Sequence, residues 1–210
     1  MDELYTTTLG NTIKIAYEET NNDGTDVDNH RKYYREFDYG IDTENNIIFI
    51  QDEIQSGLTF DIVSKVRLLK KINGNVDTVN ILLNSGGGDV IETLAFIDYM
   101  KSQKDQMKFN IIVRGMAMSA AALLLANGTG TRAASKHSKI MVHQLSTIVV
   151  GKLSDVKSNA KFSEELETEC NQLMAESTKM DKDYWQNIQS SDYFMSAEKA
   201  LELGIIDVII

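Results

Sequence analysis

The chain has 210 residues, of which 42% are hydrophobic and 25% are charged, a composition typical of one globular domain with a sizeable core. Its formal net charge of −10 disfavours sequence-independent binding of nucleic acid, and no apolar run is long enough to cross a membrane. The single cysteine, Cys170, excludes an internal disulfide, and together with a start that lacks the pattern of a signal peptide it predicts a cytoplasmic protein.

The first 44 residues are polar and irregular. A weak alternation over residues 12–17 indicates a strand, and residues 21–26 are of types that favour turns. Because the chain contains no proline, all its turns depend on Gly, Asn, Asp and Ser. The pattern of this segment indicates no function.

From residue 46 onward, short apolar runs alternate with segments of helical periodicity. Apolar runs bounded by polar residues predict buried strands, and apolar residues spaced three or four apart predict helices. The predicted strands are 47–50, 79–84, 109–113 and 139–142, and the predicted helices between them are 59–72, 90–100 and 120–126. This alternation indicates an α/β domain with right-handed crossovers.

A long helix is predicted from residue 154 to residue 179. Its apolar residues form one stripe, consisting of Val156, Phe162, Leu166, Cys170, Leu173 and Met174. At about 1.5 Å per residue the helix is roughly 40 Å long, more than the width of about 34 Å expected for a compact domain of this size. We therefore expect it to project and to bury its stripe against another copy of the chain. A short helix, capped by Ser196 and stopped by Gly204, closes the sequence.

Ser119 lies at the junction between a predicted strand and the predicted helix 120–126. At such a junction a serine hydroxyl lies beside unpaired backbone N–H groups and the positive end of a helix dipole. Both a nucleophile and a developing oxyanion are stabilised there. Serine is also favoured at this position because its hydroxyl caps a helix, and on this stretch alone the cap is the commoner role.

A nucleophilic serine needs a base within hydrogen-bond distance, and the chain has three histidines. His30 lies in the irregular N-terminal segment, and His137 lies in a polar turn where solvation is expected. His143 ends a predicted buried strand, at the sheet edge where α/β sites gather, and is the candidate base. A histidine at a strand end more often has a structural role. The histidines and Cys170 form no cluster that predicts a metal site.

The glycine-rich turn Ser85-Gly86-Gly87-Gly88 follows the predicted strand 79–84. It lacks the lysine of a phosphate-binding loop and the spacing of a dinucleotide-binding fingerprint. Three successive glycines let the backbone come close to another group and turn N–H groups outward, as an oxyanion hole requires. A tight strand-to-helix turn is the alternative interpretation.

Four motifs occur in one order along the chain, followed by Gly204-Ile205-Ile206-Asp207. They are Asn84-Ser85-Gly86-Gly87-Gly88, Gly115-Met116-Ala117-Met118-Ser119, Met141-Val142-His143-Gln144 and Asp192-Tyr193-Phe194-Met195-Ser196-Ala197. In this order and spacing they resemble the proteolytic subunit of the Clp protease family. The similarity runs from about residue 45 to the C-terminus.

The resemblance implies a serine endopeptidase. By position in the motifs, Ser119 is the implied nucleophile, His143 the general base and Asp192 the carboxylate that orients the histidine. The backbone N–H groups of Gly88 and Ala120 are the implied oxyanion hole. No cofactor and no metal is implied.

The resemblance also implies a fold and a set of partners. The fold is α/β, a crotonase-like spiral of strand–strand–helix units in one domain, with a divergent N-terminal segment (1–44), a head (45–150 and 183–210) and a handle (151–182). The handle is expected to join two rings of seven subunits into a tetradecamer, around a chamber that admits unfolded chains or short peptides. An AAA+ unfoldase is the expected partner, whereas nucleic acid and membranes are not expected to bind.

The sequence departs from the family pattern at several positions. Gly86 and Leu145 replace prolines, and Ala120 replaces a methionine after the nucleophile. Ser191 and Phe162 replace an arginine and a glutamate of the ring-to-ring contact. The first three changes leave the implied chemistry intact, whereas the last two bear on the stability of a double ring.

Two other functions are compatible with these motifs. The chain is alternatively a ring component that serves mainly as a scaffold beside active paralogues, or a crotonase-type acyl-CoA hydratase or isomerase. The acyl-CoA enzymes use oxyanion-hole N–H groups too, but with a catalytic carboxylate in place of a Ser–His pair. Fold alone does not decide between these functions.

Overall fold

The structure is a computed structural model that describes residues 5–6, 12–13, 38–188 and 191–210. Thr12–Ile13 (β2) begins the strand predicted over 12–17, and it pairs antiparallel with Tyr5–Thr6 (β1). The turn predicted over 21–26 and His30 lie outside the described residues. In the part of the chain that is described, no helix is long and apolar enough to span a bilayer.

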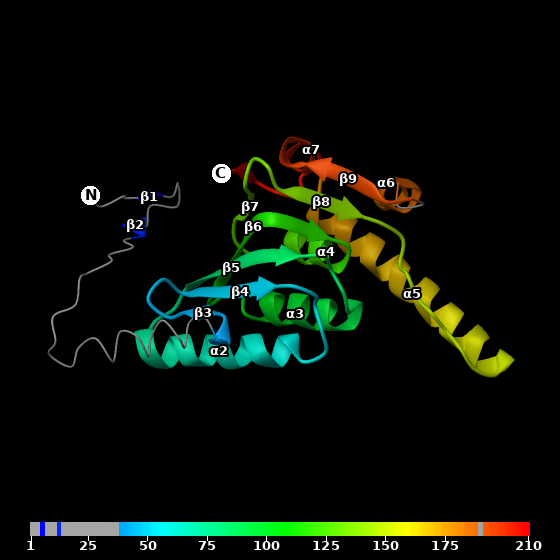
Figure 1. Cartoon of the computed structure of the whole chain (residues 1–210), viewed down its shortest axis with the longest axis horizontal. Coiled ribbons are helices and arrows are strands. Elements are labelled where there is room, and N and C mark those ends of the chain that lie inside the picture. The colour runs from blue at the N-terminus through cyan, green and yellow to red at the C-terminus, as the bar shows by residue number, and fades with distance from the viewer. Residues whose placement is uncertain (1–4, 7–11, 14–37, 189–190) are drawn as a thin grey trace, which may run out of the picture.

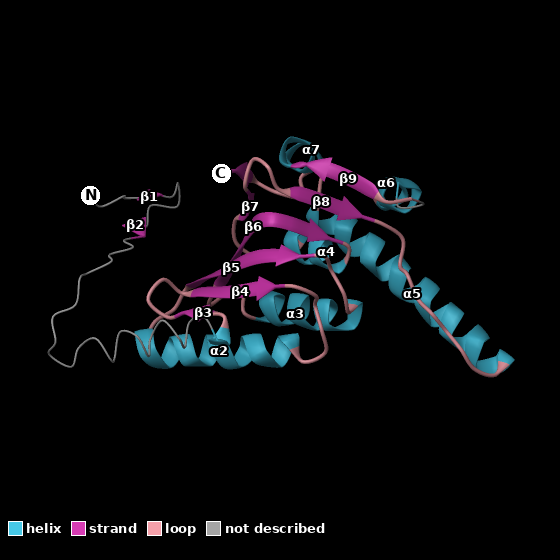
Figure 2. Ribbon diagram, in the orientation of Figure 1, coloured by secondary structure: helices cyan, strands magenta, loops and turns pink. Residues whose placement is uncertain are grey.

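One main sheet of eight strands forms the centre of the described chain (Figure 2). Its strands are β3 (Ile41–Asp42), β4 (Ile47–Gln51), β5 (Thr78–Ser85), β6 (Lys108–Met118), β7 (Arg132–Ala134), β8 (Lys139–Val142), β9 (Tyr193–Ser196) and β10 (Val208–Ile209). β4, β5, β6 and β7 run parallel in that order, with antiparallel β3 at one edge and parallel β10 beside β7. β9 pairs antiparallel with β8.

β6 is the strand on which the site is built. Residues 111–113 of β6 pair with β7, and residues 116–118 pair with β8. β6 has 11 residues, and its partner on this side changes from β7 to β8 before the strand ends at Met118, next to Ser119. Its first half is buried because apolar residues face both sides of the parallel sheet.

The helices lie around the sheet (Figure 1), and most of them pack on the next helix in the chain. They are α2 (Leu58–Asn73), α3 (Val90–Ser102), α4 (Ala120–Ala126), α5 (Leu153–Ser177), α6 (Lys182–Ile188) and α7 (Ala197–Leu203). α2 packs on α3, α3 on α4, and α4 on both β6 and α5. All seven residues of α4 are buried, because a run of alanine and leucine has no polar face to present to water.

α5 extends away from the sheet (Figure 1), as its length predicts. Only its C-terminal half packs on the core, through Cys170, Leu173 and Met174. In its N-terminal half the side chain of Phe162 is 53% exposed. The apolar stripe is thus divided between the chain's own core and a surface open to solvent.

The α/β fold class predicted from the alternating pattern is confirmed, and each strand and helix predicted between residues 47 and 142 is present. One boundary is wrong: the prediction ends a strand at residue 113, whereas β6 continues to Met118 because it pairs with β8. The strands β1, β3, β7, β9 and β10 and the helix α6 have no counterpart among the predicted elements. Segments of two to seven residues are too short to show a periodicity of their own.

Candidate active site

Ser119 occupies a strained turn between β6 and α4. Its backbone has φ 55° and ψ −126°, a left-handed conformation that is unusual for a residue with a side chain. The Ser119 N–H donates to the Met141 carbonyl of β8 at 2.8 Å, which holds the turn against the sheet. A sharp strand-to-helix turn of this kind exposes a serine hydroxyl above the sheet edge.

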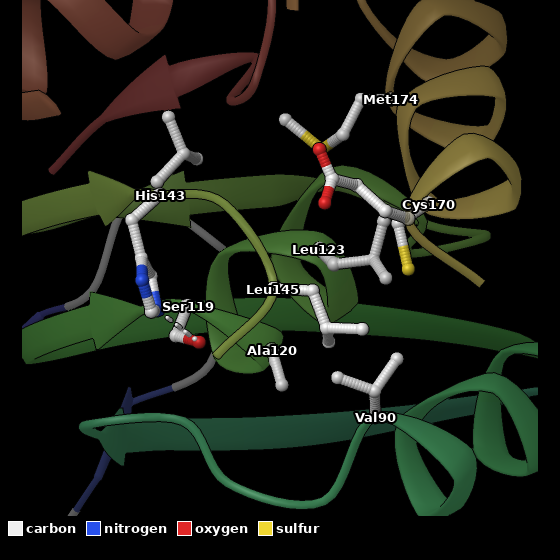
Figure 3. A pocket seen from close by; sticks show the side chains of 10 residues that line it. Val90, Ser119, Ala120, Leu123, His143, Leu145, Cys170 and Met174 are labelled. Carbon is white, nitrogen blue, oxygen red and sulfur yellow. Dashed lines mark hydrogen bonds between the residues drawn. The ribbon is translucent and has the colours of Figure 1, made fainter. Parts of the chain in front are cut away.

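His143 reaches Ser119 because β8 lies beside the end of β6. The register pairs Met118 with Met141, so the residues that follow each strand emerge at the same edge. His143 Nε2 lies 2.8 Å from Ser119 Oγ, within hydrogen-bond distance (Figure 3). The alternative role as a helix cap is wrong, because the Ser119 side chain makes no capping hydrogen bond.

The glycine turn packs directly on the turn that holds Ser119. A Cβ atom at Gly87 would lie 2.7 Å from Ser119 Cβ, so the approach requires glycine. The Gly87 carbonyl accepts from the Ile54 N–H at 2.7 Å, and the Asp89 side chain caps α3. This is the tight turn of the alternative interpretation, and it also brings the glycine backbone close to Ser119.

Two backbone N–H groups of the turns at this sheet edge have no hydrogen-bond partner among the described residues. The N–H groups of Gly88 and Ala120 donate no hydrogen bond to any residue in the described ranges. Ala120 is the first residue of α4, where the N–H has no partner inside the helix. The arrangement therefore has a hydroxyl, an imidazole and two unpaired donors at one sheet edge.

Asp192 lies at this edge too, but it does not contact the histidine. β9 pairs with β8 so that Tyr193 faces Val142, and Asp192 and His143 each lie one residue beyond that pair. The Asp192 side chain is exposed, and among the described residues no hydrogen bond or ion pair joins it to His143. The backbone is placed for a His–Asp contact that the side chain does not make.

Comparison with known proteins identifies the family. A family model described as Clp protease matches residues 34–210. The chain belongs to the Clp protease family. It is similar to ATP-dependent Clp protease proteolytic subunit 1 of Shouchella clausii (strain KSM-K16), with 35% identity over 168 residues, which cover 80% of this chain and 86% of the relative.

Membership of the Clp protease family agrees with the α/β fold and with the Ser–His pair. The chain is a serine-type peptidase of this family, and the resemblance inferred from the four motifs is confirmed. His137 is exposed in a turn, as the sequence predicts for a residue outside the site. In the described part of this Clp protease chain, no group of three or more His, Cys, Asp or Glu side chains is placed to hold a metal ion.

A pocket of about 50 Å³ opens beside the Ser–His pair of this Clp protease (Figure 3). Its walls are mainly apolar and are formed by Val90, Ala120, Leu123, Val142, Leu145, Cys170 and Met174, together with Ser119, His143 and Glu167. Three of these residues come from α5, whose apolar stripe predicted only packing and assembly. The helical period does not distinguish a residue that lines a pocket from one that fills a core.

Cys170 is the second nucleophilic side chain in the pocket. Burial raises the pKa of its thiol, and the negative charges of Glu169 and Glu167 raise it further, to about 11. The thiol is therefore protonated at neutral pH and is a poor nucleophile. Of the two side chains, Ser119 is therefore the better candidate nucleophile.

Proposed function

We propose that this chain is the proteolytic subunit of an ATP-dependent protease, and that its site hydrolyses peptide bonds with Ser119 as the nucleophile. The observation that carries the proposal is the distance of 2.8 Å between His143 Nε2 and Ser119 Oγ. A serine and a base at this distance are the minimum for acyl transfer. A crotonase-type acyl-CoA enzyme would use a catalytic carboxylate in place of this Ser–His pair.

The proposed reaction uses both members of the Ser–His pair. Ser119 Oγ attacks the carbonyl carbon while His143 Nε2 accepts the hydroxyl proton, and the imidazolium then donates that proton to the leaving amine as the C–N bond breaks. Water, deprotonated by the same histidine, releases the acyl group from Ser119. The N–H groups of Gly88 and Ala120 are the proposed oxyanion hole, and each donor of this kind contributes about 3 kcal/mol to the transition state.

Asp192 is the proposed carboxylate that orients His143. The register of β8 and β9 supports this role, since it leaves Asp192 and His143 in adjacent positions at the same edge. We propose that the carboxylate turns toward Nδ1 in the working enzyme, where it selects the tautomer that presents a basic Nε2 to Ser119.

The proposed substrates are unfolded chains and short peptides, and the proposed assembly is two stacked rings of seven copies. The relative's name, ATP-dependent Clp protease proteolytic subunit, supports an ATPase partner, for which we propose an AAA+ unfoldase. The exposed apolar surface along α5 supports contact with a second copy. A cytoplasmic location is proposed from the free thiol of Cys170.

A fluorophosphonate probe tests the proposal, because it reacts rapidly with an activated serine and not with an ordinary one. We expect the intact protein to be labelled and to cleave a fluorogenic peptide. Ser119→Ala should abolish both, and His143→Ala should reduce both sharply. His137→Ala, which changes an exposed histidine, is the matched control and should behave as the parent does.

The same experiment separates the alternatives. A folded, assembled protein that is neither labelled nor active favours the scaffold function and overturns the proposal. Labelling that persists in Ser119→Ala assigns the nucleophile to another residue.

A further inference from the structure

The pocket beside Ser119 has a single carboxylate among apolar walls. Besides the Ser–His pair, its ionisable side chains are Glu167 and Cys170. Cys170 carries no charge at neutral pH, because its pKa is raised to about 11. Glu167 itself lines the pocket, and its negative charge is one of the two that raise the pKa of the Cys170 thiol.

No cation in the described ranges pairs with Glu167. One of its oxygens accepts a hydrogen bond from Gln144 Nε2 at 3.3 Å, and the amide of Gln144 is uncharged. Within the described ranges no Lys, Arg or His forms an ion pair with Glu167, whereas Glu165 on the same helix pairs with Lys161. Glu167 is only partly exposed, so water screens its charge less than that of the exposed glutamates on α5.

We infer that Glu167 makes this pocket selective for a basic side chain, lysine or arginine, on the residue whose carbonyl Ser119 attacks. The inference deepens the proposed function and rests on it. That residue's side chain leaves the chain one atom from the reacting carbonyl, so it enters the pocket nearest to Ser119. The apolar walls contact the methylene stem, and the carboxylate binds the charged end.

The apolar walls alone would accept any aliphatic side chain of similar length. Norleucine has an unbranched aliphatic side chain like that of lysine, but without the amine. The two residues therefore differ only in the charged group. A charged hydrogen bond in a partly buried site changes the relative rates by about tenfold or more. The preference for lysine over norleucine therefore measures the contribution of Glu167.

The test uses the full-length protein and two fluorogenic peptides that differ only in lysine or norleucine at the cleaved position. In the parent protein we expect kcat/KM to be higher for lysine, and this ratio to fall by about tenfold in Glu167→Gln. Glu169→Gln is the matched control. It removes the same charge two residues away, from an exposed residue that also acts on Cys170 but does not line the pocket.

A second measurement needs no variant. In the parent protein the lysine-to-norleucine ratio should fall as ionic strength rises from about 0.05 M to about 1 M, because salt screens the interaction of Glu167 with the ammonium group. This readout applies even if Glu167→Gln fails to fold or assemble.

The outcomes separate the inference from the proposed function. Rapid cleavage of the norleucine peptide, with a ratio near one that neither salt nor Glu167→Gln changes, overturns the inference and leaves the peptidase intact. Failure to cleave either peptide overturns the proposed function and this inference together.

Discussion

Ser119 shows how a local preference is overridden by a distant contact. Its sequence position suits a helix cap, yet its hydroxyl lies 2.8 Å from His143 and caps nothing. The positive φ of 55° costs on the order of 1–3 kcal/mol. The hydrogen bond of its N–H to Met141 and the packing of Gly87 against its Cβ hold the turn in place.

Asp192→Asn should reduce kcat for peptide cleavage by about 10⁴-fold, because an amide favours the wrong tautomer of the histidine. Labelling by the fluorophosphonate should slow but persist, since Ser119 and His143 remain. Asp183→Asn, which alters an exposed carboxylate on α6, is the control. A kcat for Asp192→Asn within a few-fold of the parent value would show that Asp192 does not orient the base.

Arg132 connects α4, the helix that follows Ser119, to the projecting helix α5. Its Nη1 donates to the Ala126 carbonyl at 3.0 Å, at the end of α4, and to the Ser177 carbonyl at 2.6 Å, at the end of α5. Its Nε and Nη2 bind the Asp207 carboxylate at 3.1 and 2.6 Å. A cation at two helix C-termini satisfies carbonyls that have no partner inside the helices.

Arg132→Met should lower the free energy of unfolding by about 2 kcal/mol, since it leaves two carbonyls and a carboxylate without their charged donor. Asp207→Asn should cost less, about 1 kcal/mol, because Asp207 is more exposed and the carbonyl contacts remain. Urea unfolding at matched protein concentration, followed by the fluorescence of the single buried tryptophan, Trp185, measures both. An equal loss of unfolding free energy in Arg132→Met and Asp207→Asn would mean that the contacts of Arg132 with the two carbonyls contribute nothing to stability.

The contribution of Asp207 to the free energy of unfolding should depend on pH. Partial burial alone raises the pKa of Asp207, but the hydrogen bonds and charge of Arg132 outweigh it and hold the pKa below its ordinary value. An acid whose pKa is lowered by folding stabilises the protein above the unfolded value of about 3.9. The difference in unfolding free energy between the parent and Asp207→Asn should therefore stay constant from about pH 7 to about pH 5 and shrink below about pH 4. A difference that grows on acidification contradicts the assignment.

The whole chain leaves an apolar surface uncovered along the projecting part. Ile148 and Val150, which precede α5, are 92% and 93% exposed, and Phe162 on α5 is 53% exposed. Water is an unfavourable environment for such a group of side chains, and a second copy of the same helix offers a matching apolar face. Phe162 is apolar, so it can pack in such a contact without a charged partner.

Phe162→Asp should shift the protein toward smaller species in native mass spectrometry, because a carboxylate at the apolar contact must be desolvated without a cation. Phe60→Asp makes the same change at a phenylalanine on α2 that is 78% exposed, and it should leave the mass distribution unchanged. Dissociation by Phe60→Asp but not by Phe162→Asp would place the contact elsewhere on the molecule.

The alternating strands and helices, the length of α5 and the identity of the candidate nucleophile and base were all predictable from the sequence. Period and capping are local properties, so Ser196 and Gly204 delimit α7 as predicted. Motifs such as Met118-Ser119 and Val142-His143 carry the residue types that the chemistry needs, whatever the distance between them.

Only the tertiary structure decided which of these residues meet. The contact of Ser119 with His143 depends on the pairing of β6 with β8, and the pocket depends on the packing of α5 on α4. The placement of Asp192 without a contact to His143, and of Glu167 in the pocket, has no signal in the periodicity. Strand pairing and helix packing join residues remote in the chain, and a local pattern contains no information on those distances.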